Sequence, residues 1–260
     1  MAITENRTVK ITEATTLLTL AFKKQRPVFM WGPPGIGKSE LVEGIGASGV
    51  LGNTKVIDMR LALFEPTDLR GYPAPDLANG KMVWLPPADL PQADMAAQYD
   101  TVILFLDELN SAAPSVQAAA YQLILNRRIG QYVLPDNVVI VAAGNRDSDK
   151  GVTYRMPMPL ANRFVHIEMR PDFNSWQIWA VNKGIHKDVV GYLSFAKQDM
   201  YDFDAKASSR AFATPRSWVF VSDLLADEDN VDNDTLFNLV AGAVGDGLRP
   251  AYGHSQFRHT

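Results

Sequence analysis

The sequence predicts an α/β fold in which a parallel sheet is flanked by helices and followed by a small helical domain. Two apolar runs, residues 101–106 and 138–143, lack the polar alternation of a half-exposed strand, so each is predicted to be buried on both faces of a parallel sheet. Segments with helical patterns lie between the predicted strands, as is typical of parallel sheets. After residue 172 the helical patterns continue, but no further strong strand is predicted.

The other elements of the first part follow in chain order. Residues 12–24 are predicted to be a helix, with Thr12 as its cap and Glu13 in the first turn, where a negative charge suits the helix dipole. A helix is also predicted at 114–125, with Pro114 in its first turn. Further strands are predicted at residues 28–31, 54–59 and 164–168.

An insertion with a short hairpin interrupts the alternation of predicted strands and helices. Between residues 63 and 94 several prolines exclude a long uninterrupted helix, and Asn79-Gly80 is typical of a hairpin turn. A second small hairpin is predicted at residues 127–135. We expect Trp84 and Tyr132, one in each hairpin, to pack locally rather than grip a substrate.

The predicted domains are residues 1–172, an α/β core that carries the hairpin insertion near 63–94, and residues 173–260, a helical domain. Its helices are predicted at residues 175–182, 187–197, 215–225 and 235–244.

The strongest motif lies between the strand at 28–31 and the helix that follows it. It has the form G-x-x-x-x-G-K-S of a phosphate-binding loop, and its residues are Gly32, Pro33, Pro34, Gly35, Ile36, Gly37, Lys38 and Ser39. Glycines let the backbone amides turn inward, and the amides and the helix N-terminus together attract anions. Lys38 can reach the β- and γ-phosphates of a nucleotide, and the Ser39 hydroxyl can ligate Mg²⁺. The sequence therefore predicts ATP and Mg²⁺ as ligands.

Two carboxylates, Asp107 and Glu108, follow the apolar run at 101–106. Ligands of open α/β sheets bind at the carboxyl edge of the strands, where these acids are predicted to lie. Asp107 can hold Mg²⁺, through a water molecule, and Glu108 can act as the general base on an attacking water. The alternative is that both acids are solvated residues at a strand end without a catalytic role. The phosphate-binding loop in the same chain favours the catalytic role.

Three further residues are candidates for contacts with the γ-phosphate. Asn145 follows the strand at 138–143 and can orient water without adding charge; an ordinary turn asparagine is the alternative. Arg163 precedes the strand at 164–168 and could reach a phosphate on a neighbouring subunit, with Arg155 as a weaker rival. Arg216 opens a helix of the second domain and could report the state of the nucleotide; for both arginines the alternative is a surface role.

Composition narrows the functional classes. The chain has no cysteine, which fits a reducing compartment, and its first residues are polar rather than typical of a signal peptide. No apolar run is long enough to span a bilayer, so we expect a cytoplasmic protein without a membrane partner. The net charge is −4, whereas many nucleic-acid-binding domains are strongly basic, so a nucleic-acid partner is not expected.

In order, the motifs resemble those of AAA+ ATPases, and within them the MoxR family. The segments that carry the resemblance are residues 32–39, 104–108, 142–145, 161–164 and 214–218, together with 65–71 before the first hairpin and 130–135 in the second. The resemblance implies that Asn145 is sensor 1, Arg163 an arginine finger acting in trans and Arg216 sensor 2 in a lid domain. It also implies a ring, usually a hexamer, with ATP between subunits, and a protein partner that often carries a von Willebrand A domain.

The leading hypothesis is therefore an ATP hydrolase whose nucleotide cycle remodels or matures a protein partner. Two alternatives stay open at this point. One is a nucleic-acid motor or loader built on the same core. The net negative charge of the chain argues against this alternative. The other is a nucleotide-gated scaffold with little turnover, which would not need the base Glu108.

Overall fold

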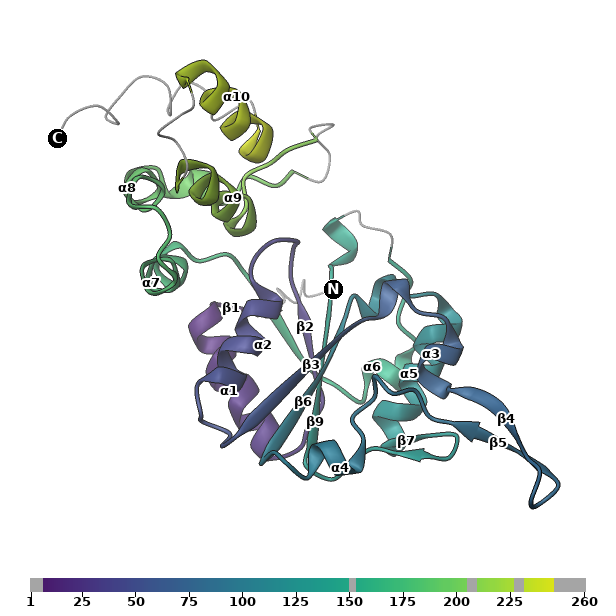
Figure 1. Cartoon of the computed structure of the whole chain (residues 1–260). Helices are drawn as coiled ribbons and strands as arrows, with labels where there is room; N and C mark the ends of the chain where they lie inside the picture. Colours follow the sequence, from purple (N-terminus) through teal and green to yellow (C-terminus); the bar gives the residue numbers. More distant parts are fainter. Residues whose placement is uncertain (1–6, 150–152, 205–209, 227–231, 246–260) are drawn as a thin grey trace, which may run out of the picture. The chain divides into compact units, whose positions relative to one another are not determined.

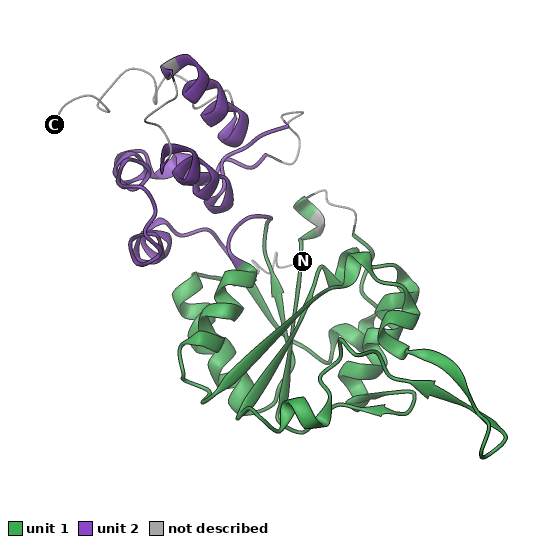
Figure 2. Ribbon diagram, in the orientation of Figure 1, with its two compact units in different colours: residues 1–33, 38–169 green, residues 34–37, 170–260 purple. Residues whose placement is uncertain are grey.

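The computed structural model describes residues 7–149, 153–204, 210–226 and 232–245. The chain divides into two compact units (Figure 2). The first contains residues 1–33 and 38–169, and the second contains residues 34–37 and 170–260. Of the predicted helical domain, residues 205–209, 227–231 and 246–260 lie outside the described residues. The assignment of the two units as a nucleotide-binding core and a lid stays a prediction.

A six-stranded sheet forms the centre of the first unit, with strand order β1-β10-β2-β9-β6-β3. Every neighbouring pair in this sheet is parallel, as predicted. The strands are β1 (Thr8–Val9), β2 (Val28–Trp31), β3 (Thr54–Arg60), β6 (Thr101–Asp107), β9 (Val138–Gly144) and β10 (Val165–Met169). The two residues of β1 were not predicted, because a strand this short has no readable period.

Helices cover both faces of the sheet (Figure 1). The helices of the first unit are α1 (Ile11–Lys23), α2 (Lys38–Ala47), α3 (Pro66–Arg70), α4 (Ala93–Ala96), α5 (Pro114–Asn126) and α6 (Met158–Ala161). Short 3₁₀ turns occur at η1 (Leu61–Leu63), η2 (Leu109–Ser111) and η3 (Asp147–Asp149). Helix α1 begins one residue before the predicted start, and the Glu13 carboxylate accepts the Lys10 backbone N–H at 2.9 Å, so Thr12 is not its cap.

The register of the sheet explains its core. Phe29 pairs with Ala142, and Ala142 pairs with Leu106, so all three side chains lie on one face of the sheet. That face packs against α5, through residues that include Val116 and Leu123. The parallel strands β6 and β9 are buried along nearly their whole length, which is why their sequences show no polar alternation.

Two hairpins extend the core. The hairpin of β4 (Tyr72–Asp76) and β5 (Lys81–Leu85) projects from the first unit (Figure 1), and the second is formed by β7 (Arg128–Ile129) and β8 (Tyr132–Val133). Gly71 opens the first hairpin with φ +87°, and a Cβ there would lie 1.9 Å from the Leu85 carbonyl oxygen. Only glycine fits this close approach.

The hairpin aromatics pack locally, as expected. The Tyr132 hydroxyl donates to the Pro91 carbonyl at 2.6 Å in a buried position, and this burial raises the pKa of the phenol. Arg70 places its guanidinium carbon 4.3 Å from the centroid of the Trp84 ring, a cation–π contact.

The second unit is helical. It contains α7 (Phe173–Lys183), α8 (Lys187–Phe195), the 3₁₀ turn η4 (Lys197–Met200), α9 (Pro215–Ala226) and α10 (Asn233–Val244). The Asp172 carboxylate accepts the Ser175 backbone N–H and caps α7. Trp218 of α9 is fully buried at the centre of this unit, and its indole N–H donates to the Asp199 carbonyl at 2.9 Å. Within the described residues, no helix has the length and hydropathy that a membrane crossing requires.

Candidate functional site

The loop between β2 and α2 has the backbone that the phosphate-binding motif predicts. Gly35 and Gly37 have φ values of +74° and +89°, which side-chain-bearing residues rarely adopt. Helix α2 begins at Lys38, so the amides of its first turn, including that of Ser39, are available to an anion. Local sequence and structure agree here, because both require a tight turn directly before a helix.

Lys38 joins this loop to a second strand end. Its Nζ donates to the carbonyl oxygens of Gly32 at 2.8 Å and Pro33 at 3.1 Å. It also lies 3.4 Å from Asn145 Oδ1, at the end of β9. The structure thus brings together two of the predicted site residues that are far apart in the sequence.

Asp107 and Glu108 lie at the carboxyl end of β6, the strand next to β9. Asp107 is buried, and its Oδ1 accepts the Glu108 backbone N–H at 2.8 Å. Glu108 has φ +56°, a left-handed conformation that costs a non-glycine residue about 1–2 kcal/mol. Strained residues of this kind occur at functional sites, where the surrounding structure fixes an unusual side-chain direction.

The carboxylates produce a negative field at this edge. The pKa of Asp58, on the adjacent strand β3, is raised, first by partial burial and next by the charge of Asp107. Glu43 and Glu108 act in the same direction, while Arg60 opposes them. A bound cation would relieve this repulsion. Ser39 and Asp107 offer the hard oxygen ligands that Mg²⁺ prefers, so the residues present fit this ion.

Asn110 is a residue of the site that the sequence analysis missed. It is 1% exposed, and its Nδ2 donates to the Asn145 backbone carbonyl at 2.7 Å. Its Oδ1 has no hydrogen-bond partner and lies against Gly144, where a Cβ would come within 2.1 Å of it. No pattern in the sequence pointed to it, because its hydrogen-bond partner Asn145 lies 35 residues further along the chain.

Arg146 fixes the loop that follows Asn145 through ion pairs and a hydrogen bond. The Arg146 guanidinium pairs with Asp149 at 2.8 Å and lies 3.6 Å from the Glu168 carboxylate of β10. The Arg146 backbone N–H donates to the Asp149 carboxylate at 2.9 Å. The Asn145 side chain is therefore presented from a loop that is tied on both sides.

Neither of the two predicted arginines follows one of these strand ends. Arg163 is exposed in the turn before β10 and is therefore at the amino edge of the sheet, opposite the loop and the acids. It has no ion-pair partner within the described part of the chain. Arg216 belongs to the second unit, where its backbone N–H donates to the Gly35 carbonyl at 3.3 Å. The roles of both arginines stay predictions.

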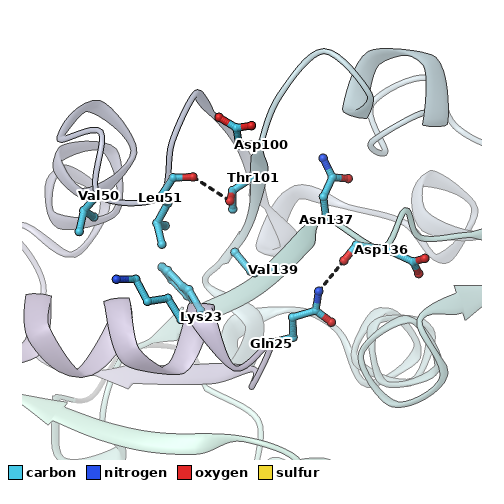
Figure 3. Close-up of a pocket in the computed structure, with 10 residues that line it drawn as sticks. Lys23, Gln25, Val50, Leu51, Asp100, Thr101, Asp136, Asn137 and Val139 are labelled. Carbon is cyan, nitrogen blue, oxygen red and sulfur yellow. Dashed lines mark hydrogen bonds between the residues drawn. The ribbon is translucent and has the colours of Figure 1, made fainter.

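A cavity of about 470 Å³ also lies at the amino edge of the sheet (Figure 3). Several of its polar side chains already hold loops together. Thr101 donates to the Leu51 carbonyl at 3.0 Å, Gln25 to the Asp136 carbonyl at 2.7 Å, and Asp100 accepts the Asn53 backbone N–H at 2.7 Å. These bonds indicate a structural role for the cavity lining.

Comparison with known proteins now gives the site its context. The family model described as AAA domain (dynein-related subfamily) matches residues 27–164. Midasin from Giardia intestinalis is 31% identical over an alignment of 155 positions, which covers 56% of this chain and 3% of that protein. The crystal structure of NtrX from Brucella abortus has a TM-score of 0.55 at 16% identity, covering 94% of this chain and 56% of that one. Its complex with ATP gives 0.54 at 16% identity, covering 93% and 55%.

The likeness to NtrX concerns the fold alone, and this chain spans only about 3% of the length of Midasin. The family match, however, covers more than half of the chain and contains the phosphate-binding loop, both acids and Asn145. The chain therefore belongs to the AAA domain family, dynein-related subfamily.

Proposed function

We propose that the carboxyl edge of the sheet is the site of ATP hydrolysis, and that the reaction drives the remodelling of a protein partner by a ring of subunits of MoxR type. The observation that carries this proposal is the 3.4 Å approach of Lys38 Nζ to Asn145 Oδ1 beside the strand end that bears Asp107 and Glu108. A phosphate-binding lysine, two acids and a neutral amide are what hydrolysis of a phosphoanhydride requires.

Each residue has a distinct role in this proposal. Loop amides of residues 32–39 cradle the phosphates, and Lys38 exchanges its carbonyl partners for phosphate oxygens. Ser39 and Asp107, the latter through water, would hold Mg²⁺, which neutralises charge on the β- and γ-phosphates when bound. Glu108 accepts the proton of the attacking water, and the Asn145 amide orients that water against the γ-phosphate.

Asn110 positions Asn145 rather than touching ATP. Its hydrogen bond to the Asn145 carbonyl fixes the backbone from which the amide extends. Gly144 supports the same arrangement, because any side chain there would displace Asn110. Small displacements of positioned groups lower turnover strongly, since the attacking water must be aligned in the transition state.

The place of Arg163 supports action in trans. In the sheet register Val165 pairs with Val28, at the start of β2, whereas the phosphate-binding loop follows Trp31 at its end. At ~3.3 Å per residue, the two ends of β2 are roughly 10 Å apart. Arg163, still further from the loop than Val165, is therefore suited to a neighbouring subunit's ATP, and members of this family commonly assemble into rings.

We propose Arg216 as sensor 2, because its helix begins beside the phosphate-binding loop residue Gly35.

The first hairpin supports a protein partner. Large apolar side chains are exposed along it, and Leu77 near its turn is 88% exposed. The others are Tyr72, Met82 and Leu85. Exposed apolar clusters of this kind mark protein contacts more often than nucleic-acid contacts, which need basic surfaces. A partner carrying a von Willebrand A domain and a hexameric ring belong to this proposal through the MoxR resemblance.

The proposed chemistry predicts different defects at Glu108 and Lys38. Glu108→Gln should keep ATP bound and lower kcat by about 100-fold or more, because the base is lost but the phosphate contacts remain. Lys38→Ala should lose ATP binding. Equilibrium binding of ATP and steady-state phosphate release measure the two effects, and Glu13→Gln, the same change at an exposed position of helix α1, should leave both unchanged. Equal turnover by Glu108→Gln and the parent would exclude Glu108 as the base.

The positioning role of Asn110 predicts a selective loss of turnover. Asn110→Asp replaces the donor by an oxygen that repels the Asn145 carbonyl, so kcat should fall about tenfold with ATP affinity retained. Gly144→Ala should have the same effect, because its Cβ forces Asn110 away. Asn137 is the matched control at the other edge of the sheet, where its Nδ2 donates to the carbonyls of Ala96 and Tyr99, each at 2.9 Å. Asn137→Ala should lower thermal stability but not the turnover of the folded protein.

Action of Arg163 in trans predicts complementation in mixed rings. Arg163→Ala alone should turn over ATP poorly, and so should Glu108→Gln alone. Mixing the two should raise phosphate release above both, because the intact base of one subunit meets the intact arginine of its neighbour. Arg155→Ala is the control, since Arg155 is also exposed before β10 and should be dispensable. No recovery in mixtures would argue against action in trans.

The protein-partner proposal predicts ATP-dependent capture through the hairpin. Glu108→Gln protein loaded with ATP should retain a partner that Lys38→Ala does not, and the double variant Leu77→Ser, Met82→Ser in the same background should lose it. Mass spectrometry identifies what is retained. If duplex or single-stranded DNA instead binds tightly, loses affinity as salt rises and stimulates turnover, a nucleic-acid motor would be the better reading.

A further inference from the structure

Four aromatic rings form a continuous contact between the strand that precedes the phosphate-binding loop and the turn that carries Arg163. They belong to Phe29 and Trp31 on β2 and to Phe164 and His166 at β10. The Phe29 centroid lies 4.2 Å from that of Trp31 and 5.5 Å from that of Phe164. The Trp31 and His166 rings are stacked with centroids 6.0 Å apart. Phe29 and Trp31 are two residues apart in sequence, and so are Phe164 and His166, so the side chains of each strand lie on one face of the sheet.

His166 adds two directed bonds to these ring contacts. Its Nδ1 lies 2.9 Å from Trp31 Nε1, and its Nε2 lies 2.8 Å from the Ala161 carbonyl oxygen. An indole N–H can only donate and a carbonyl can only accept, so Nδ1 must be the acceptor and Nε2 must carry the proton. Neutral His166 in this tautomer satisfies both partners at once.

The Ala161 carbonyl is the anchor of the Arg163 turn. It also accepts the backbone N–H of Phe164 at 3.2 Å, which closes the turn around Arg163. The Arg163 backbone N–H donates to the Leu160 carbonyl at 3.0 Å. His166 therefore hydrogen-bonds to the same carbonyl that closes the turn from which the Arg163 side chain extends. At its other end it holds Trp31, whose next residue is Gly32.

We propose that His166 is a positioning residue that ties the Arg163 turn to the phosphate-binding loop of its own subunit. The inference rests on the proposed role of Arg163 as a finger for the neighbouring subunit. Under that role, the bridge from Trp31 through His166 to Ala161 connects two active sites: the subunit's own loop at one end and the neighbour's γ-phosphate at the other. A shift of the loop end of β2 on ATP binding would be passed to the arginine that serves the next site.

The first test separates the hydrogen bonds from the packing. His166→Phe keeps an aromatic ring but removes both bonds, and Trp31→Phe removes the indole donor together with one of the two fused rings. Each should lower kcat for ATP, about tenfold for His166→Phe, with ATP affinity unchanged, because the finger is misplaced while the loop still binds. The double variant should be no worse than His166→Phe alone, since both changes break one bridge. Val165→Thr, a near-isosteric change at the preceding exposed residue, should have no effect.

The second test asks in which site the defect appears. If His166 acts through Arg163, mixing His166→Phe with Glu108→Gln subunits should restore turnover, because His166→Phe sites then receive intact fingers. Recovery by Arg163→Ala mixtures but not by His166→Phe mixtures would overturn this inference and leave the finger proposal standing. Failure of both mixtures would overturn the trans action of Arg163, and the inference with it.

A spectroscopic measurement tests the bridge without any variant that could fail to fold. Nitrogen chemical shifts of the neutral His166 ring in the parent protein should show an unprotonated Nδ1 and a protonated Nε2. A ring with the proton on Nδ1 cannot accept from Trp31 and would overturn the proposal.

Discussion

The parallel direction of β2, β6 and β9 is the constraint on which the site depends. Because these three neighbouring strands run the same way, the segments that follow them emerge at one edge. The loop of residues 32–39, the acids Asp107 and Glu108, and Asn145 are each the continuation of one of these strands. If one strand were reversed, its polar residues would be moved a full strand length away.

The same parallel arrangement separates the arginine from this edge. Arg163 precedes its strand, whereas the other predicted site residues of the core follow theirs. Under the proposed function, a subunit built in this way would hold the nucleotide at one edge and present Arg163 at the other, so a ring of such subunits would make each site from two chains. Strand β2 takes part in both edges. Its carboxyl end leads into the phosphate-binding loop, and its aromatic side chains contact Phe164 and His166, which follow Arg163 in the chain.

Much of this architecture was predictable because it depends on local patterns. The apolar runs within β6 and β9 predicted burial on both faces of the sheet, and Asn79-Gly80 predicted the first hairpin. The strand–loop–helix order around the phosphate-binding motif was also predicted, and the structure has β2, the loop and α2 in this order. Asn110, Arg146 and His166 were not predicted, because their importance comes from partners 35, 22 and 135 residues away in sequence, respectively. Single side chains carry no period, and their partners are defined only by the register of the sheet.

The outer strand β3 also limits how copies of this protein can meet. It borders the sheet opposite the two-residue strand β1, and it carries the exposed charged side chains of Lys55, Asp58 and Arg60. Charges on a border strand oppose the docking of another strand, and a two-residue strand offers too short a template. Sheets of adjacent copies are therefore not expected to merge into one continuous ribbon. Contacts in any closed oligomer would come from loops and helices, which can separate and re-form without breaking backbone pairing inside a subunit.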